Sequence, residues 1–235
     1  MSAPRLTDLP LWSRFEERAL GVLHRALTLM PETDPNFREP RLSRALFGCI
    51  AEANRLINLE NEGAFEYLPS YDGYQAPQNV AGDPEESERK RPDFIWSLHD
   101  HAAASGLEGC REFVVECKRL GDPPGQNTLN HRYVDLGIVR FVSPRHKYGM
   151  RGASGAMVGY VQRSNKRTIL AVVQARAATH ALAAVVPYGT LDDAILELEQ
   201  LLERTFGESP FRLHHFWVML RLAPVSSPGS SPQEK

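Results

Sequence analysis

The chain has 235 residues, of which 42% are apolar and 24% are charged, and its formal net charge is −2. This composition is typical of a folded globular protein and excludes disordered, collagen-like and disulfide-dense classes. It also argues against a protein that coats nucleic acid without specificity. The three cysteines show no Cys-x-x-Cys spacing, and the sequence has neither a long apolar run nor a signal-like start. We therefore expect a cytoplasmic protein with no membrane span, one domain over residues 1–223 and a disordered tail over 224–235.

The small net charge hides two oppositely charged segments. Residues 31–90 carry twelve acids and six bases, a net charge of −6, whereas residues 131–167 carry eight bases and one acid, a net charge of +7. A positive field of this size is able to hold a phosphate backbone. A solvated basic surface is the alternative that charge alone leaves open.

The N-terminal half is predicted to contain two helices and three strands. Apolar residues at intervals of three and four predict helices over 10–30 and 42–60. Short strands are expected over 65–71, 91–98 and 111–118, with a polar loop at 72–90.

The C-terminal half is predicted to alternate between helices and strands. We expect helices over 129–142, 164–179 and 190–206, and strands over 154–161, 181–188 and 211–222. In the last helix Thr190 is the expected N-cap, with Asp193 three residues further on. Together the two halves predict an α/β fold with a mixed central sheet flanked by helices.

Two acidic residues and one lysine stand where strands are otherwise apolar. Because side chains on one face of a strand recur at every second residue, Glu116 and Lys118 point the same way, and the carbonyl of Cys117 can turn toward a metal ion. Asp93 belongs to the only Pro-Asp pair of the chain and opens the preceding strand. Two carboxylates and a carbonyl oxygen suit Mg²⁺. The alternative is that Glu116 and Lys118 form a surface ion pair and that Asp93 caps a turn.

The Pro92-Asp93 pair followed by the triplet Glu116-Cys117-Lys118 resembles the PD-(D/E)xK nuclease superfamily. The resemblance implies a restriction-endonuclease-like αβββαβ core over about 42–161, extended by the helix at 10–30 and by the helix and strand at 190–222. It also implies a divalent-metal-dependent nuclease that hydrolyses DNA phosphodiester bonds with Mg²⁺, for which Mn²⁺ would substitute. In that reading Asp93, Glu116 and the Cys117 carbonyl hold the metal, and Lys118 orients or deprotonates the attacking water.

The resemblance further implies an acidic residue on the first core helix. Glu52 lies at the edge of the apolar stripe of the helix at 42–60 and is the expected match, bound to the metal directly or through water. Glu60 and Glu62 are nearby alternatives.

Nucleic-acid contacts are expected from the helix at 129–142 and the basic segment around it. The candidates are Arg132, Tyr133, Arg140, Lys147 and Arg151, and the alternative is an amphipathic helix with a charged outer face. DNA is the expected partner, and the expected setting is restriction or phage defence, with a homodimer or a larger complex. The competing interpretation is a catalytically inactive nuclease-like fold that serves as a nucleic-acid-binding or protein-interaction module.

Overall fold

The computed structural model describes residues 8–33, 37–60, 68–76, 85–123, 125–188, 190–191 and 193–220. The expected tail at 224–235 and the first part of the expected strand at 65–71 lie outside these residues. No helix within the described ranges is long and apolar enough to cross a membrane.

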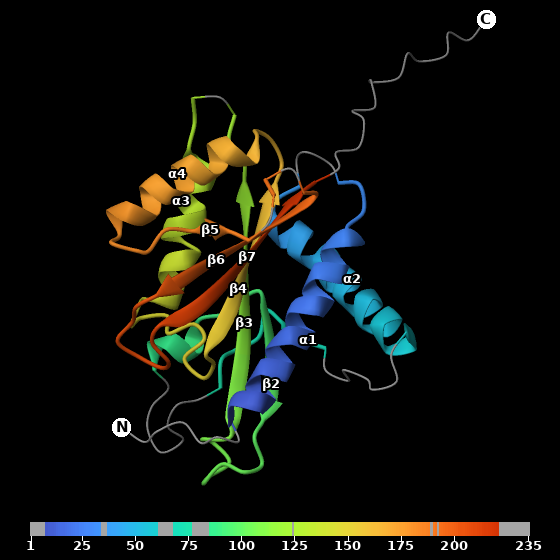
Figure 1. The fold of residues 1–235 in the computed structure, drawn as a ribbon, viewed down its shortest axis with the longest axis vertical. Coiled ribbons are helices and arrows are strands. Elements are labelled where there is room, and N and C mark those ends of the chain that lie inside the picture. The colour runs from blue at the N-terminus through green and yellow to red at the C-terminus, as the bar shows by residue number, and fades with distance from the viewer. Residues whose placement is uncertain are drawn as a thin grey trace, which may run out of the picture.

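A mixed seven-stranded sheet forms the centre of the molecule (Figure 1). Its strands, in the order in which they lie side by side, are β1 (Ser70–Tyr71), β2 (Phe94–His99), β3 (Cys110–Leu120), β4 (Ser154–Val161), β7 (Phe211–Met219), β6 (Ile195–Leu202) and β5 (Val186–Pro187). The three central strands β3, β4 and β7 run parallel, and the outer pairs are antiparallel. The predicted α/β class with a mixed sheet is confirmed.

Helices cover both faces of this sheet (Figure 1). Helices α1 (Asp8–Thr28) and α2 (Glu39–Glu60) pack on one face, and α3 (Thr128–Asp135) and α4 (Lys166–Thr179) pack on the other. The side chains of each central strand therefore contribute alternately to two separate apolar clusters, one on each face of the sheet. In β3, Val115 and Cys117 join the α1/α2 cluster, whereas Val114 joins the α3/α4 cluster.

The segment predicted as a helix at 190–206 is instead the strand β6. Its alternate residues Leu196, Leu198 and Leu202 are buried in the α3/α4 cluster, while Glu197 and Glu199 face the other way. Leucine and glutamate favour helices, but here the backbone hydrogen bonds are made to β7 and the burial repeats every second residue. The predicted cap contact exists, because the Thr190 hydroxyl donates to Asp193 at 2.8 Å, but it closes a turn rather than a helix. The strand expected at 181–188 is shortened to β5.

The helix predicted at 129–142 is broken in two. After α3 the chain turns at Gly137 and continues as the 3₁₀ helix η2 (Ile138–Phe141). A Cβ atom at residue 137 would lie 2.3 Å from the carbonyl oxygen of Tyr133 and 2.5 Å from the Met157 side chain, so only glycine fits at this break. The break sets the direction of Arg140, which lies in η2.

Candidate active site

The site is built where β2 and β3 separate. The pairing of these strands ends at Phe94 and Val115, while β3 continues to Leu120, so within the described chain β2 leaves one edge of β3 uncovered beyond Val115. Asp93 immediately precedes β2, and its Oδ2 atom accepts a hydrogen bond from the backbone N–H of Cys117 at 2.8 Å. The Asp93 carboxylate therefore bridges the two strands at the point of separation.

Glu116 is the most deeply buried acid of the site, with 1% of its side chain exposed. Its Oε1 atom accepts hydrogen bonds from Lys118 Nζ at 2.5 Å and from Arg140 Nη1 at 2.6 Å. Its Oε2 atom is buried and has no hydrogen-bond partner among the described residues. One oxygen of this carboxylate is thus paired with two cations, and the other is a buried acceptor.

The Lys118 ammonium lies among three oxygen atoms. Besides Glu116 Oε1, it donates to the carbonyl of Cys117 and to Glu39 Oε1, each at 2.8 Å. Glu39 begins α2, which covers the opposite face of the sheet, and the open edge of β3 lets the lysine reach it. The expected proximity of Asp93, Glu116 and Lys118 is thus observed, with Glu39 as an additional member.

Helix α2 contributes two groups to the site from its first turns. Glu39 pairs with Lys118, and one turn later Ser43 lies beside the Asp93 carboxylate, where its hydroxyl lowers the pKa of that group. The structure does not bring Glu52 to this group. Glu52 lies 13 residues after Glu39, about 20 Å further along the helix axis, and its exposed carboxylate is held by Arg55 at 2.6 Å.

Burial and neighbouring charges shift the pKa values of the ionisable groups of the site in opposite directions. Burial raises the pKa of Glu116 to about 7, although the Lys118 and Arg140 cations oppose the rise. Burial also raises the pKa of Asp93, against the opposing effect of Lys118. For Lys118 burial lowers the pKa, but the three surrounding carboxylates outweigh burial, and the pKa lies above its ordinary value. In this arrangement Lys118 is a charged hydrogen-bond donor and not a base.

The donor atoms of this site fit a hard divalent cation. The carboxylates of Asp93 and Glu116 and the carbonyl of Cys117 are oxygen ligands of the kind that Mg²⁺ binds, and the unpartnered Glu116 Oε2 is a buried acceptor that a cation would satisfy. Three His, Cys, Asp or Glu side chains are nowhere grouped around one point in the described ranges. The Lys118 ammonium lies between the carboxylates of Glu39 and Glu116.

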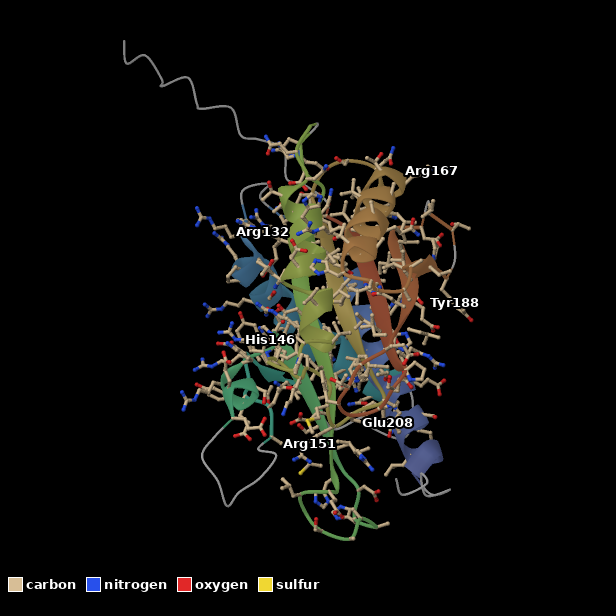
Figure 2. All side chains as sticks on the ribbon, turned by 90° about the vertical axis from the view of Figure 1, so that its left-hand side faces the viewer. Arg132, His146, Arg151, Arg167, Tyr188 and Glu208 are labelled. Atoms are coloured by element: carbon tan, nitrogen blue, oxygen red, sulfur yellow. The ribbon has the colours of Figure 1, made fainter. Side chains whose placement is uncertain are left out.

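A cleft of about 670 Å³ opens beside Lys118, and we call it the cationic cleft. It is lined by the start of α2, by β3, by α3 and by η2, through Arg38, Glu39, Pro40, Lys118, Arg119, Leu129, Arg132, Leu136 and Arg140. Two residues predicted to bind nucleic acid, Arg132 and Arg140, therefore lie beside the site. Figure 2 shows Arg132 far from Arg151 along the same side of the molecule.

The other three predicted nucleic-acid residues are used elsewhere. Tyr133 is completely buried, and its hydroxyl contacts His215 Nδ1 at 2.8 Å and Trp217 Nε1 at 3.0 Å, so the prediction that it contacts nucleic acid is wrong for this structure. Lys147 forms an ion pair with Glu85 at 2.6 Å, and Arg151 donates to the Leu107 carbonyl at 2.6 Å. Neither lines the cationic cleft.

Glu39 was missed because the helix was predicted to begin at Leu42, after Pro40, and Ser43 carried no signal that set it apart from the other residues of that helix. Proline is well accommodated in the first turn of a helix, where its missing N–H would have no partner, and the observed helix includes Pro40. With that start, the spacing of four residues between Glu39 and Ser43 places both on one face. Arg38 and Arg119 carried no sequence signal beyond their charge.

Comparisons with protein-family models, with curated proteins and with solved structures found no match.

Proposed function

We propose that this protein is a divalent-metal-dependent nuclease that hydrolyses phosphodiester bonds, with DNA as its substrate. The observation that carries the proposal is the meeting of Asp93, Glu116 and Lys118 at the open edge of β3, beside a cleft lined by five cationic side chains and one carboxylate. Deeply buried charges cost stability, and groups of them are found preferentially at functional sites.

The arrangement of elements around the site supports a restriction-endonuclease-like core. In chain order α2, β1, β2, β3, α3 and β4 follow the predicted αβββαβ succession. The first three strands are antiparallel neighbours, and α3 connects β3 to the parallel strand β4. The proposed metal ligands and the lysine then come from β3 and from Asp93, the residue immediately before β2.

Each side chain has a distinct task in this proposal. Asp93, Glu116 and the Cys117 carbonyl would hold Mg²⁺ or Mn²⁺, which as a Lewis acid supplies stabilisation of the charge that develops on the phosphoryl group. The Lys118 ammonium donates to a phosphate oxygen or orients the attacking water, and offsets negative charge. Arg140, now bound to Glu116, is close enough to add a second cation to the same phosphate. A role in restriction or phage defence in the cytoplasm, as a homodimer or within a larger complex, belongs to the same proposal.

One observation favours a second candidate function, a nuclease-like fold that binds nucleic acid without cutting it. Lys118 and Arg140 already neutralise Glu116 Oε1. A stable ion-pair network of this kind is able to persist without a metal ion.

Nuclease assays separate the two candidates. Plasmid, linear duplex DNA, single-stranded DNA and RNA are each incubated with the protein in Mg²⁺, Mn²⁺ or EDTA. We expect cleavage with either metal and none with EDTA, and a loss on the order of 10²-fold or more in Asp93→Asn, Glu116→Gln and Lys118→Ala. Glu52→Gln is the matched control, because that carboxylate is exposed and remote from the site. Binding without cleavage of any substrate would favour the non-cutting module.

A further inference from the structure

The cationic cleft carries more positive charge than the residues of the active site use. Five cations and one carboxylate line it. Two of the cations are already engaged, because Lys118 is paired with Glu39 and Glu116, and Arg140 with Glu116. The remaining three, Arg38, Arg119 and Arg132, have no hydrogen-bond or ion-pair partner among the described side chains.

These three arginines surround the cleft from three different elements. Arg38 directly precedes α2, Arg119 lies on β3 and Arg132 lies on α3. Two basic residues further along the chain, Arg145 and Lys147, differ in this respect, because they are paired with Glu86 and Glu85 of the acidic segment. Since unpaired guanidinium groups bind phosphate oxygens in a planar, bidentate manner, the cleft is arranged for a polyanion with several phosphates.

The form of the cleft favours one strand over a double helix. Its walls are the start of α2 and the helix α3, and Lys118 and Arg119 of β3 lie between them. The reacting phosphate has to approach Glu116, of which only 1% of the side chain is exposed, so it has to enter the cleft rather than lie across its rim. At about 670 Å³ the hollow has the size of a small-ligand cleft, which suits a short stretch of one strand.

The apolar side chains that line the cleft also favour a single strand over a duplex. Pro40, Leu129 and Leu136 share the cleft with the arginines, and Leu136 is 49% exposed. A duplex hides its base faces by stacking, whereas an unpaired strand presents them. Apolar side chains between phosphate-binding cations therefore fit the sugars and bases of an unpaired strand.

We infer that the cationic cleft binds a single nucleic-acid strand, with Arg38, Arg119 and Arg132 on phosphates that flank the reacting one and with Leu129 and Leu136 against its sugars and bases. This inference rests on the proposed function, since it takes the Asp93–Glu116 site as the place of reaction. It assigns to the protein an unpaired substrate, such as a single-stranded or frayed end.

The test measures binding separately from cleavage. The full chain is titrated, in EDTA and over a series of salt concentrations, against a fluorescent single-stranded 20-mer and against the same sequence as a duplex, with anisotropy as the readout. The test variant combines Arg38→Gln, Arg119→Gln and Arg132→Gln. The control variant combines Arg25→Gln, Arg55→Gln and Arg145→Gln, which removes the same charge from exposed arginines that are already in ion pairs.

We expect the wild-type protein to bind the single strand more tightly than the duplex. Loss of three phosphate contacts should reduce the magnitude of the slope of log K against log[salt] by about 2 on the single strand. The control variant should keep the wild-type slope. Unchanged slope and affinity in the folded test variant would overturn the inference, and so would duplex binding as tight as strand binding.

The outcomes also separate this inference from the nuclease proposal. If the wild type cleaves DNA and the test variant binds the strand normally, the cleft assignment fails while the nuclease proposal stands. If the wild type binds the strand through the three arginines and cleaves nothing in Mg²⁺ or Mn²⁺, the nuclease proposal fails and the binding assignment stands.

Discussion

The ammonium of Lys118 and the carboxylate of Glu39 lie 2.8 Å apart, although 79 residues separate them in the chain and their elements belong to different layers. The contact passes around the edge of β3 that β2 leaves open. Glu39 thus fixes the position of a lysine that the sequence alone pairs only with Glu116. In the proposed reaction Glu39 is a positioning residue.

The first prediction compares Glu39→Gln with Glu52→Gln. Loss of the Glu39 charge weakens one of the three oxygen contacts that hold the Lys118 ammonium, and a misplaced cationic group lowers the reaction rate. We expect Glu39→Gln to lower the initial cleavage rate on the order of 10-fold or more, and Glu52→Gln to leave it unchanged. Equal activities of the two variants would remove Glu39 from the site, and a loss confined to Glu52→Gln would restore the sequence-based assignment.

The second prediction concerns the pH dependence of stability through Glu116. Its pKa is about 7 in the folded protein and near 4.5 in the unfolded chain, so between these values the folded state keeps a proton that the unfolded state has lost. The free energy of unfolding of the wild type therefore falls as pH rises from 4.5 to 7, by about 3 kcal/mol from this group. The glutamine in the Glu116→Gln variant does not titrate, so the variant does not lose this part of its free energy of unfolding.

Urea denaturation at pH 4.5, 6, 7 and 8 in EDTA measures this difference. We expect the stability of Glu116→Gln relative to the wild type to increase by about 3 kcal/mol between pH 4.5 and 8. Curves that run parallel over this range would show that the Glu116 carboxyl has an ordinary pKa in the folded protein.

The third prediction addresses the buried tyrosine that was expected to contact nucleic acid. Tyr133→Phe removes a hydroxyl that bonds both His215 and Trp217, and it leaves two buried polar groups without a partner. We expect a loss of about 1–3 kcal/mol in the free energy of unfolding. Strand affinity, measured by anisotropy on the folded variant, should stay at the wild-type value. Weaker strand binding at unchanged stability would place the hydroxyl at the nucleic acid instead.

The fourth prediction distinguishes strand from helix at 195–202. In β6 Leu198 is 2% exposed and Leu201 is 46% exposed, whereas a helix would place both on the same face, three residues apart. Leu198→Ala should cost about 2–5 kcal/mol of unfolding free energy, and Leu201→Ala should stay within about 0.5 kcal/mol of the wild type. Similar losses in the two variants, measured by urea denaturation, would indicate the helix.

The sequence by itself determined those features of the site and fold that depend only on local geometry. The alternation of a strand is enough to place Glu116 and Lys118 on one face, and the resemblance of the Pro-Asp pair and the following triplet to a nuclease pattern selects Asp93. The same local rules locate most of α1 and α2, because their apolar residues recur at helical spacing, and they also locate β4 and α4.

Only the tertiary structure decided the features that depend on contacts between distant segments. Segment 195–202 has the composition of a helix and becomes a strand because β7 offers it a hydrogen-bonding edge. Glu39, and not Glu52, reaches the site because the edge of β3 stays open beside the first turn of α2. Among the basic residues at 131–167, the acidic segment neutralises Lys147 and leaves Arg132 unpaired in the cleft. The charge of each residue and the apolar periodicity of each segment can be read from the sequence. Which oppositely charged side chains form ion pairs is decided only when the helices and the sheet pack together.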